Sequence, residues 1–301
     1  MRRSTLDNRL KLDLDASLDA TTAAKPRDAA TILFVRDGEK GVEIFCVERA
    51  KGSRFLGGAI VFPGGAVDEE DHNGDWEGFT SGARFGRLEA EPAMGRALGI
   101  AACREALEEA RLLPTLDANT RASRPLEDAR LDSLRAVGSA ELREVLRREN
   151  LLLDLDALVP FARWVTPIAE KRRFDARFFV ARAPLGQTGA HDESETTRSF
   201  WATPHDVLAR FAANEIQLAP PTHRTLEILA TAASVDEILG AQYYLGVICP
   251  ELRPHVDVKG ETMALTIPGD PEHSSPEALL PGSSRYVLRD GSWFAENAPK
   301  K

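Results

Sequence analysis

The stretch that decides the fold and the site is Arg104-Glu105-Ala106-Leu107-Glu108-Glu109-Ala110-Arg111. Each residue of a helix turns by about 100°, so this spacing predicts Glu105, Glu108 and Glu109 on one face and apolar side chains opposite. Carboxylates three and four residues apart repel one another, which favours a cation among them. Oxygen ligands are typical of a hard divalent ion such as Mg²⁺ or Mn²⁺, and not of Zn²⁺. Arg104 lies one turn before Glu108 and is expected to pair with it.

A helix rich in Glu and Arg is also typical of a solvated surface, and these eight residues alone favour that interpretation. The upstream sequence changes the balance. Residues 59–71 read as a buried strand that ends in Pro63-Gly64-Gly65 and continues as an acidic loop. Two adjacent glycines let the backbone approach a ligand or another strand closely. The two segments together therefore indicate a functional site.

These segments resemble the signature of the Nudix hydrolases: a glycine, five residues, a glutamate, seven residues, then R-E-U-x-E-E-x-G-U, with U apolar. Gly65 corresponds to the first glycine. The second half is matched by Arg104, Glu105, Ala106, Glu108, Glu109 and Leu112. Asp71 stands in place of the glutamate, Arg111 in place of the late glycine, and residues 72–103 separate the two halves. This split resembles the insert-carrying branch of the family that includes peroxisomal-type coenzyme A diphosphatases.

The resemblance implies an α/β/α sandwich with a mixed β-sheet, and metal-dependent hydrolysis of a phosphoanhydride in a nucleoside diphosphate-linked substrate. Coenzyme A or acyl-coenzyme A is the expected substrate. ADP-ribose, dinucleoside polyphosphates and nucleotide sugars are alternatives within the same chemistry. A nucleotide-sensing or scaffold protein with weak catalysis also stays open, because Asp71 and Arg111 depart from the signature.

The resemblance also assigns roles to residues. Glu105, Glu108 and Glu109 would hold Mg²⁺ or Mn²⁺, Arg104 would orient the glutamates, and Gly65 would let the loop fold against them. In the family a further glutamate on a later loop often binds metal or acts as general base. Glu195 corresponds to it by its spacing ahead of Phe200-Trp201, with Glu193 as the alternative.

The two departures carry expectations of their own. Asp71 is one methylene shorter than glutamate, so its contact with the metal or with Arg104 is expected to be lost or bridged by water. Arg111 replaces a glycine that could end a helix with a positive φ, so the helix is expected to run on or to end differently.

Four arginines are candidates for binding the phosphates of the substrate. Arg49 directly follows a predicted core strand, and Arg54 lies in the loop after it. Arg172 and Arg173 form a basic turn between two predicted strands. The alternative for the first pair is exposed loop cations, and for the second pair structural salt bridges.

Three parts of the chain are expected: an N-terminal arm at residues 1–28, a Nudix domain at 29–240, and a β-rich extension at 241–301 packed on that domain. Apolar runs at 29–36 and 42–48 predict a hairpin. The apolar segment 177–182 predicts a central strand.

Residues 72–99 are predicted to be an insert within the signature. Trp76, Phe79 and Phe85 need cover, so an ordered flap is expected, which shapes the pocket or packs against a second subunit or the domain's own flank. Residues 126–153 predict one or two amphipathic helices that break near Gly138.

Composition limits the class of partner. The formal net charge of −9 argues against a nucleic-acid polymer or an anionic membrane, and a small nucleotide remains possible because a bound metal ion inverts the local field.

Three cysteines without a C-x-x-C arrangement indicate free thiols in a reducing compartment. No apolar run is long enough to span a bilayer, so a cytoplasmic protein is expected, with a homodimer as a possibility. No serine-hydrolase elbow, Walker loop or dinucleotide-binding glycine motif is present.

Overall fold

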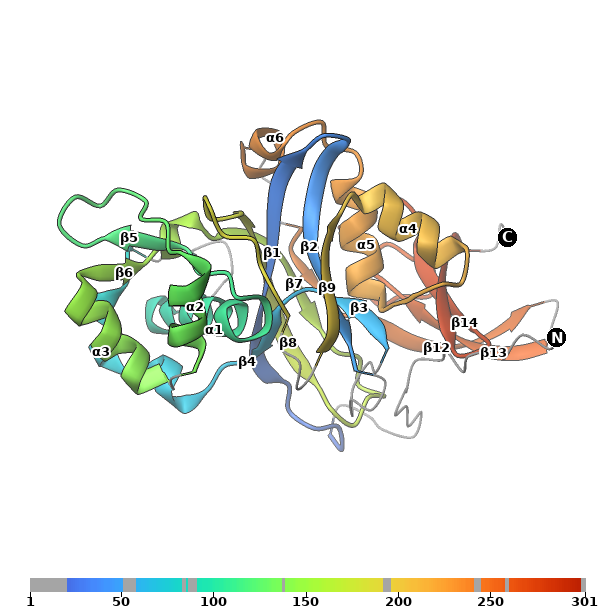
Figure 1. Cartoon of the computed structure of the whole chain (residues 1–301). Coiled ribbons are helices and arrows are strands. Elements are labelled where there is room, and N and C mark those ends of the chain that lie inside the picture. The colour runs from blue at the N-terminus through green and yellow to red at the C-terminus, as the bar shows by residue number, and fades with distance from the viewer. Residues whose placement is uncertain are drawn as a thin grey trace.

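The computed structural model describes residues 21–50, 58–82, 85, 91–136, 139–191, 196–240, 245–257 and 260–298. Most of the predicted N-terminal arm, together with Arg54, Glu193 and Glu195, lies outside the described residues. A large mixed sheet stands between two groups of helices, and a smaller sheet follows near the C-terminal end (Figure 1). The predicted α/β/α sandwich with a β-rich C-terminal extension is confirmed.

The main sheet has nine strands among the described residues, with β8 (Phe174–Arg182) near its centre. It pairs in parallel with β1 (Arg27–Gly38) and antiparallel with β7 (Val159–Val165), so the predicted central strand is confirmed. Strand β1 forms the predicted hairpin with β2 (Gly41–Arg49). The other strands are β3 (Ala59–Val61), β4 (Gly64–Ala66), β9 (Thr196–Ala202), β10 (Gln217–Leu218) and β11 (Val247–Ile248).

Both faces of the sheet are covered, so the side chains of β1 alternate between two hydrophobic cores. Phe34 belongs to the core shared with α1 (Pro92–Ala110), and Leu33 to the core on the opposite face. The helices of that opposite face are α4 (Pro204–Ala212), α5 (Pro220–Leu229) and α6 (Val235–Gly240). In the part of the chain that the structure describes, no helix is both long and apolar enough to cross a bilayer.

Helix α1 is longer than the short helix predicted around Arg104. It begins at Pro92, so residues 92–99, expected to close the insert, form its first half. Proline suits the first helical position because its missing N–H would have no helical partner there. A Cβ at Gly99 would lie 3.0 Å from the Phe85 ring, so this glycine lets the helix pack closely. Glycines lower helix propensity, which hid this half of the helix from sequence analysis.

The described part of the insert is ordered, as predicted. The short 3₁₀ helix η1 (Glu69–His72) leads into it, and a second one, η2 (Gly74–Phe79), lies within it. Trp76 is 1% exposed and Phe85 is buried, so both have the cover that their size demands. The segment packs on the chain's own α3 (Ser139–Glu149).

Residues 126–153 form two helices and a strand. Helices α2 (Asp128–Arg135) and α3 lie on either side of Gly138, as predicted. The expectation that the helical region extends to residue 153 was wrong, because Leu151–Leu153 form β6, paired with β5 (Thr115–Asp117). Asn150 has a φ of +57°, which ends α3 and redirects the chain. The 3₁₀ helix η4 (Leu155–Ala157) follows β6.

The C-terminal extension is a four-stranded antiparallel sheet of β12 (Glu251–Asp257), β13 (Gly260–Thr266), β14 (Arg285–Arg289) and β15 (Ser292–Glu296). Its buried Leu265, Tyr286 and Trp293 form one core with Ala59 of β3. The hydroxyl of Ser292 donates to the Gln217 side chain at 2.6 Å. Strand β11 lies within the predicted extension but pairs with β7 of the main sheet. The division of the chain into domains stays a prediction.

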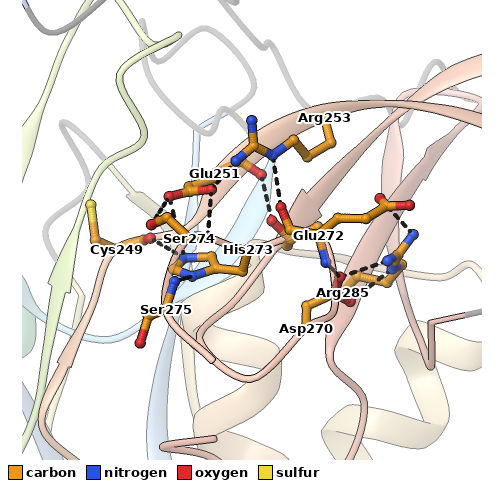
Figure 2. Close-up of polar contacts among 10 residues, drawn as sticks. Cys249, Glu251, Arg253, Asp270, Glu272, His273, Ser274, Ser275 and Arg285 are labelled. Atoms are coloured by element: carbon orange, nitrogen blue, oxygen red, sulfur yellow. Dashed lines mark hydrogen bonds and ion pairs between the residues drawn. The ribbon is translucent and has the colours of Figure 1, made fainter. Parts of the chain in front are cut away.

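A buried ion pair holds the long loop of the extension to β14 (Figure 2). The guanidinium of Arg285 donates to both carboxylate oxygens of Asp270, at 2.9 and 2.6 Å, and both residues are 1% exposed. Burial opposes ionisation of Asp270, but the hydrogen bonds from Arg285 and Ser284 outweigh it and lower the pKa of this carboxyl. The ionised form is therefore the one that stabilises the fold.

Substituting Asp270→Asn should lower the free energy of unfolding by up to about 3–5 kcal/mol at pH 7, because it removes the buried counter-charge of Arg285 and leaves the half-exposed Glu272, at 3.2 Å, to balance that charge. The stabilisation from a lowered pKa is present above the unfolded pKa, near 3.9, and is lost as pH falls through the folded value. Urea unfolding at a series of pH values should show that the wild type loses this stabilisation as the pH falls. The Asp270→Asn variant should not show that loss. The exposed Glu261→Gln in β13 is the control. Equal stability of Asp270→Asn and wild type would contradict the assignment.

Candidate active site

Helix α1 presents three glutamates beside the Pro-Gly-Gly loop. The opposite side chains, Cys103, Ala106, Leu107 and Ala110, are buried, as the helical period predicts. One oxygen of Glu109 accepts a hydrogen bond from the backbone N–H of Gly64 at 3.0 Å. Its other oxygen lies 3.8 Å from the guanidinium of Arg49. The glutamate face of the helix therefore meets the loop and the end of β2 directly.

Each of the two glycines of the loop is required by a different neighbour. A Cβ on Gly64 would lie 2.5 Å from the carbonyl oxygen of Ala30 and 2.7 Å from the Cα of Thr31 in β1. A Cβ on Gly65 would lie 2.3 Å from a carboxylate oxygen of Glu105. Gly64 thus permits the pairing of β4 with β1, and Gly65 leaves room for a glutamate of the site.

Arg104 is the centre of the charged contacts. It is 7% exposed, and its Nε and Nη2 donate to the two oxygens of Asp71 at 3.2 and 3.0 Å. Its Nη1 donates to Glu105 at 2.7 Å and lies 3.5 Å from Glu108, which confirms the expected pairing with that carboxylate. Nη2 also donates to the carbonyl of Ala66 at 3.0 Å.

The expectation that Asp71 loses its contact with Arg104 was wrong. The short side chain reaches the guanidinium through two direct hydrogen bonds because η1 brings the backbone of Asp71 close to α1. The Asp71 carboxylate, 1% exposed, also accepts from the backbone N–H of Asp68 at 2.9 Å. The position of the loop therefore compensates for the missing methylene.

Arg111 ends the helix in the way that a glycine would. Its φ is +52°, and its N–H donates to the carbonyl of Leu107 at 3.1 Å. The side chain pairs with Asp128 at 3.0 Å and Asp132 at 3.2 Å in α2, interactions that hold a non-glycine residue in this conformation. The expectation that the helix would run on or end differently was wrong.

Burial and mutual repulsion both disfavour ionisation of the glutamates. Burial raises the pKa of Glu105; Arg104 opposes the effect, whereas Glu108 and Asp68 add to it. Burial likewise raises the pKa of Glu108, against Arg104 and together with Asp68 and Asp71. A cation among these side chains would relieve that repulsion.

The donor set fits a hard divalent cation, because all the side chains that share the repulsion are carboxylates. Among the described residues, no three His, Cys, Asp or Glu side chains are already gathered into a coordination site. Glu105 is turned to Arg104, and Glu109 to the backbone of Gly64. Coordination would therefore require these side chains to turn toward a shared ion.

Comparisons with known proteins identify the family of the chain. A family model described as the NUDT19 Nudix domain matches residues 91–229. A solved structure of a Nudix hydrolase from Alicyclobacillus acidocaldarius is 31% identical with a TM-score of 0.61, and the alignment covers 72% of this chain and 97% of that one. The chain belongs to the Nudix hydrolase family. Nudix hydrolases generally use divalent metal ions. The family-model match begins at α1 and does not include Gly65 or Asp71. The contacts described above are what assign these two residues to the site.

Two curated relatives of this Nudix hydrolase carry the name acyl-coenzyme A diphosphatase NUDT19. The protein from Homo sapiens is 27% identical over 303 residues, which cover 85% of this chain and 80% of the relative. The protein from Xenopus laevis is 23% identical over 239 residues, which cover 65% of this chain and 62% of the relative. The chain thus spans less than two thirds of the Xenopus relative.

The candidate arginines of this Nudix hydrolase differ from one another in their surroundings. Arg49 lies beside Glu109, whereas Arg54 and the candidate glutamates Glu195 and Glu193 lie outside the described residues. Arg173 is engaged elsewhere, because its guanidinium donates to the carbonyls of Thr166 and Ala24 at 3.1 and 2.8 Å. Arg172 is exposed. Their roles in substrate binding stay predictions.

For Asp68, within the acidic loop of residues 59–71, the sequence predicted no role, and for Gly64 it predicted only a close approach of the backbone. Asp68 lies 3.6 Å from Arg104 and raises the pKa of both Glu105 and Glu108, so it belongs to the charge balance of the site. Gly64 donates its N–H to Glu109. The available signal was the Pro-Gly-Gly-x-x-Asp spacing, which places an acid three residues before the predicted acidic position, Asp71.

A second polar cluster, in the extension, combines a thiol, an imidazole and a carboxylate (Figure 2). Both nitrogens of His273 are occupied by backbone groups: Nδ1 accepts from Ser275 N–H at 2.9 Å, and Nε2 lies 3.0 Å from the Cys249 carbonyl. Figure 2 shows the thiol of Cys249 pointing away from the ring. Burial raises the pKa of this thiol, and raises that of Cys46 to about 12. The thiol and the imidazole of this cluster are therefore not a nucleophile and base in contact.

A cleft of about 630 Å³ at the β1–β2 turn is also separate from the glutamates. Arg36, Glu43 and Trp201 line it. The Arg36 guanidinium lies 4.2 Å from the centre of the Trp201 ring and pairs with Glu43 at 2.7 Å. Its charge is therefore already neutralised, and the carboxylates of α1 define the candidate site.

The two loop glycines should respond differently to substitution by alanine. Gly64→Ala should lower the free energy of unfolding by about 1–3 kcal/mol, because its methyl group would overlap the backbone of β1. Gly65→Ala should lower it less, because the carboxylate end of Glu105 can turn away. Chemical denaturation of both variants tests this order, and a greater loss for Gly65→Ala would contradict it.

Restoring the glutamate of the family signature should destabilise this chain. Asp71→Glu adds a methylene to a buried side chain whose oxygens are already satisfied, which should cost about 1–3 kcal/mol. The neighbouring Asp68→Glu, at an exposed side chain, is the matched control and should change little. Urea unfolding measures both. An Asp71→Glu variant as stable as wild type would show that the loop adjusts freely.

Proposed function

We propose that this Nudix hydrolase cleaves the phosphoanhydride of a nucleoside diphosphate-linked substrate, with coenzyme A or acyl-coenzyme A as that substrate and Mg²⁺ or Mn²⁺ as the cofactor. The observation that carries the proposal is the face of Glu105, Glu108 and Glu109 set against the Gly64–Gly65 loop. The names of the curated relatives support the choice of coenzyme A.

Glu105, Glu108 and Glu109 are the residues proposed to hold the metal. A bound Mg²⁺ or Mn²⁺ would lower the pKa of a water molecule and neutralise charge that builds on the phosphate oxygens. Glu109 is fixed by the Gly64 N–H through one oxygen, so its other oxygen, beside Arg49, is the one placed to turn toward a ligand. Glu108 is the most exposed of the three.

Arg104 is proposed to act as a positioning residue and not to touch the substrate. Its Nε and Nη2 are committed to Asp71 and to the carbonyl of Ala66, which fixes the plane of the guanidinium. Nη1 then holds Glu105 and, at longer range, Glu108. The guanidinium thus keeps two carboxylates oriented while it remains buried.

Arg49 is the described cation best placed to bind a substrate phosphate. It lies at the end of β2, and its Nη1 is 3.8 Å from Glu109. A phosphate bound at the metal would therefore lie near this guanidinium, which suits a charge-assisted contact. Arg54 and either Glu195 or Glu193 are proposed to complete the site from segments adjoining β2 and β9, with the glutamate taking the proton of the attacking water.

A panel of substrates tests the reaction. The full chain is incubated with Mg²⁺ or Mn²⁺ and with coenzyme A, ADP-ribose, a dinucleoside polyphosphate or a nucleotide sugar, and products are identified by mass. Formation of 3′-phosphoadenosine 5′-phosphate and phosphopantetheine from coenzyme A supports the proposal. Cleavage of the other substrates alone would overturn the choice of coenzyme A. Binding without any cleavage would favour a nucleotide sensor.

Substituting Glu109→Gln should reduce the rate of hydrolysis by about 10²–10⁴-fold, the scale of essential acid-base and electrostatic groups. The amide oxygen can still accept from Gly64 N–H, so the fold should be retained. Initial rates at saturating metal measure the effect. Glu144→Gln on α3 is the control, because that side chain is exposed and pairs with the exposed Arg147 of the same helix. Near-normal turnover by Glu109→Gln would remove this glutamate from the mechanism.

A further inference from the structure

We propose that Arg143 of α3 is a positioning residue for the site, acting through the segment of residues 69–79. It would hold this segment so that Asp71 stays against Arg104. The expected effect on kcat rests on the proposed function. The expected effect on metal affinity does not, because metal binding is measured without substrate. The family signature contains neither α3 nor residues 72–79, so Arg143 and Trp76 would support the site from outside the signature.

Arg143 reaches away from α3 into the 69–79 segment. Its Nη2 lies 3.4 Å from a carboxylate oxygen of Glu70, and its Nη1 3.9 Å from Asp75. The guanidinium carbon is 5.4 Å from the centre of the Trp76 ring. The side chain is only 12% exposed, whereas Arg147, one turn later on the same helix, is 65% exposed and pairs within the helix. Arg143 is therefore committed to this contact.

Trp76 links Arg143 to the residues around Asp71. The indole is 1% exposed, and its Nε1 donates to the carbonyl of Glu70 at 3.0 Å. Arg143 thus holds both the side chain of Glu70 and the ring that anchors its backbone. Glu70 directly precedes Asp71 within η1, so a shift of Glu70 moves Asp71.

The last step runs from Asp71 to the glutamates. The two hydrogen bonds from Arg104 to Asp71 set the plane of the guanidinium, and Nη1 of the same group holds Glu105 and lies near Glu108. A small displacement of Asp71 therefore changes where two proposed metal ligands point.

Helix α3, which carries Arg143, is itself anchored in the hydrophobic core. Leu142 and Leu146, on its inner face, are buried in the same hydrophobic core as the apolar face of α1. The helix that carries Arg143 and the helix that carries the glutamates are thus packed on one core, and the 69–79 segment is held between them.

The test compares Arg143→Met, which keeps an unbranched apolar stem of similar bulk but removes the guanidinium with its charge and donors, with Arg147→Met on the exposed face of the same helix. Arg143→Met should lower kcat and weaken Mn²⁺ binding, each by about 10- to 100-fold, the range for groups that orient metal ligands. KM for coenzyme A should stay within about threefold, since no substrate contact is lost. Arg143→Lys should recover part of both losses. Arg147→Met should match wild type.

Mn²⁺ binding is measured without substrate by electron paramagnetic resonance, and folding by thermal melting. Trp76→Phe is the second variant: it keeps an aromatic ring but removes the Nε1 bond to Glu70 and part of the buried ring volume, and it should shift kcat and Mn²⁺ affinity in the same direction by less. A folded Arg143→Met or Trp76→Phe with wild-type kcat and Mn²⁺ affinity would overturn the inference. If wild type cleaves nothing but Mn²⁺ affinity still depends on Arg143, the proposed function fails and the positioning role stands.

Discussion

The site depends on one buried guanidinium among too many carboxylates. Arg104 lies within 4 Å of Asp68, Asp71, Glu105 and Glu108, so one positive charge faces four acidic groups. Four minus one leaves an excess of three negative charges when all the groups are ionised. Burial makes that excess costly, as the raised pKa values of Glu105 and Glu108 show. Arg104 relieves part of this repulsion, and the excess that remains favours a further cation.

The fold brings the required groups together from separate parts of the chain. Strand β4 pairs with β1 and presents Gly64 and Gly65 to α1, while η1 brings Asp71 to the same helix. The residues between these segments pack on α3 and on the shared core, so the long separation in sequence does not separate the groups in space. A split signature can thus give an intact site, provided that the intervening residues have their own buried anchors.

Regular periodicity was the part of the structure that sequence could predict. The 3.6-residue period placed the glutamates on one face of α1, and the apolar runs of β1, β2 and β8 gave the hairpin and the central strand. Short or irregular elements gave no such signal. Leu151–Leu153 form a strand too short to show alternation, and the contact of Asp71 depends on where η1 places its backbone. The αL conformation of Arg111 depends on Asp128 and Asp132, which lie on another helix.

The core shared by β3 and the C-terminal sheet has a consequence for the order of events during synthesis. Ala59 of β3 is covered by Leu265, Tyr286 and Trp293, and β3 leads within a few residues into the loop that meets the glutamates. A ribosome makes those covering residues long after β3 and α1. Until they emerge, the side of Ala59 that they cover stays open to water, so the nascent chain can form α1 early but can complete the wall beside it only after β15 has emerged.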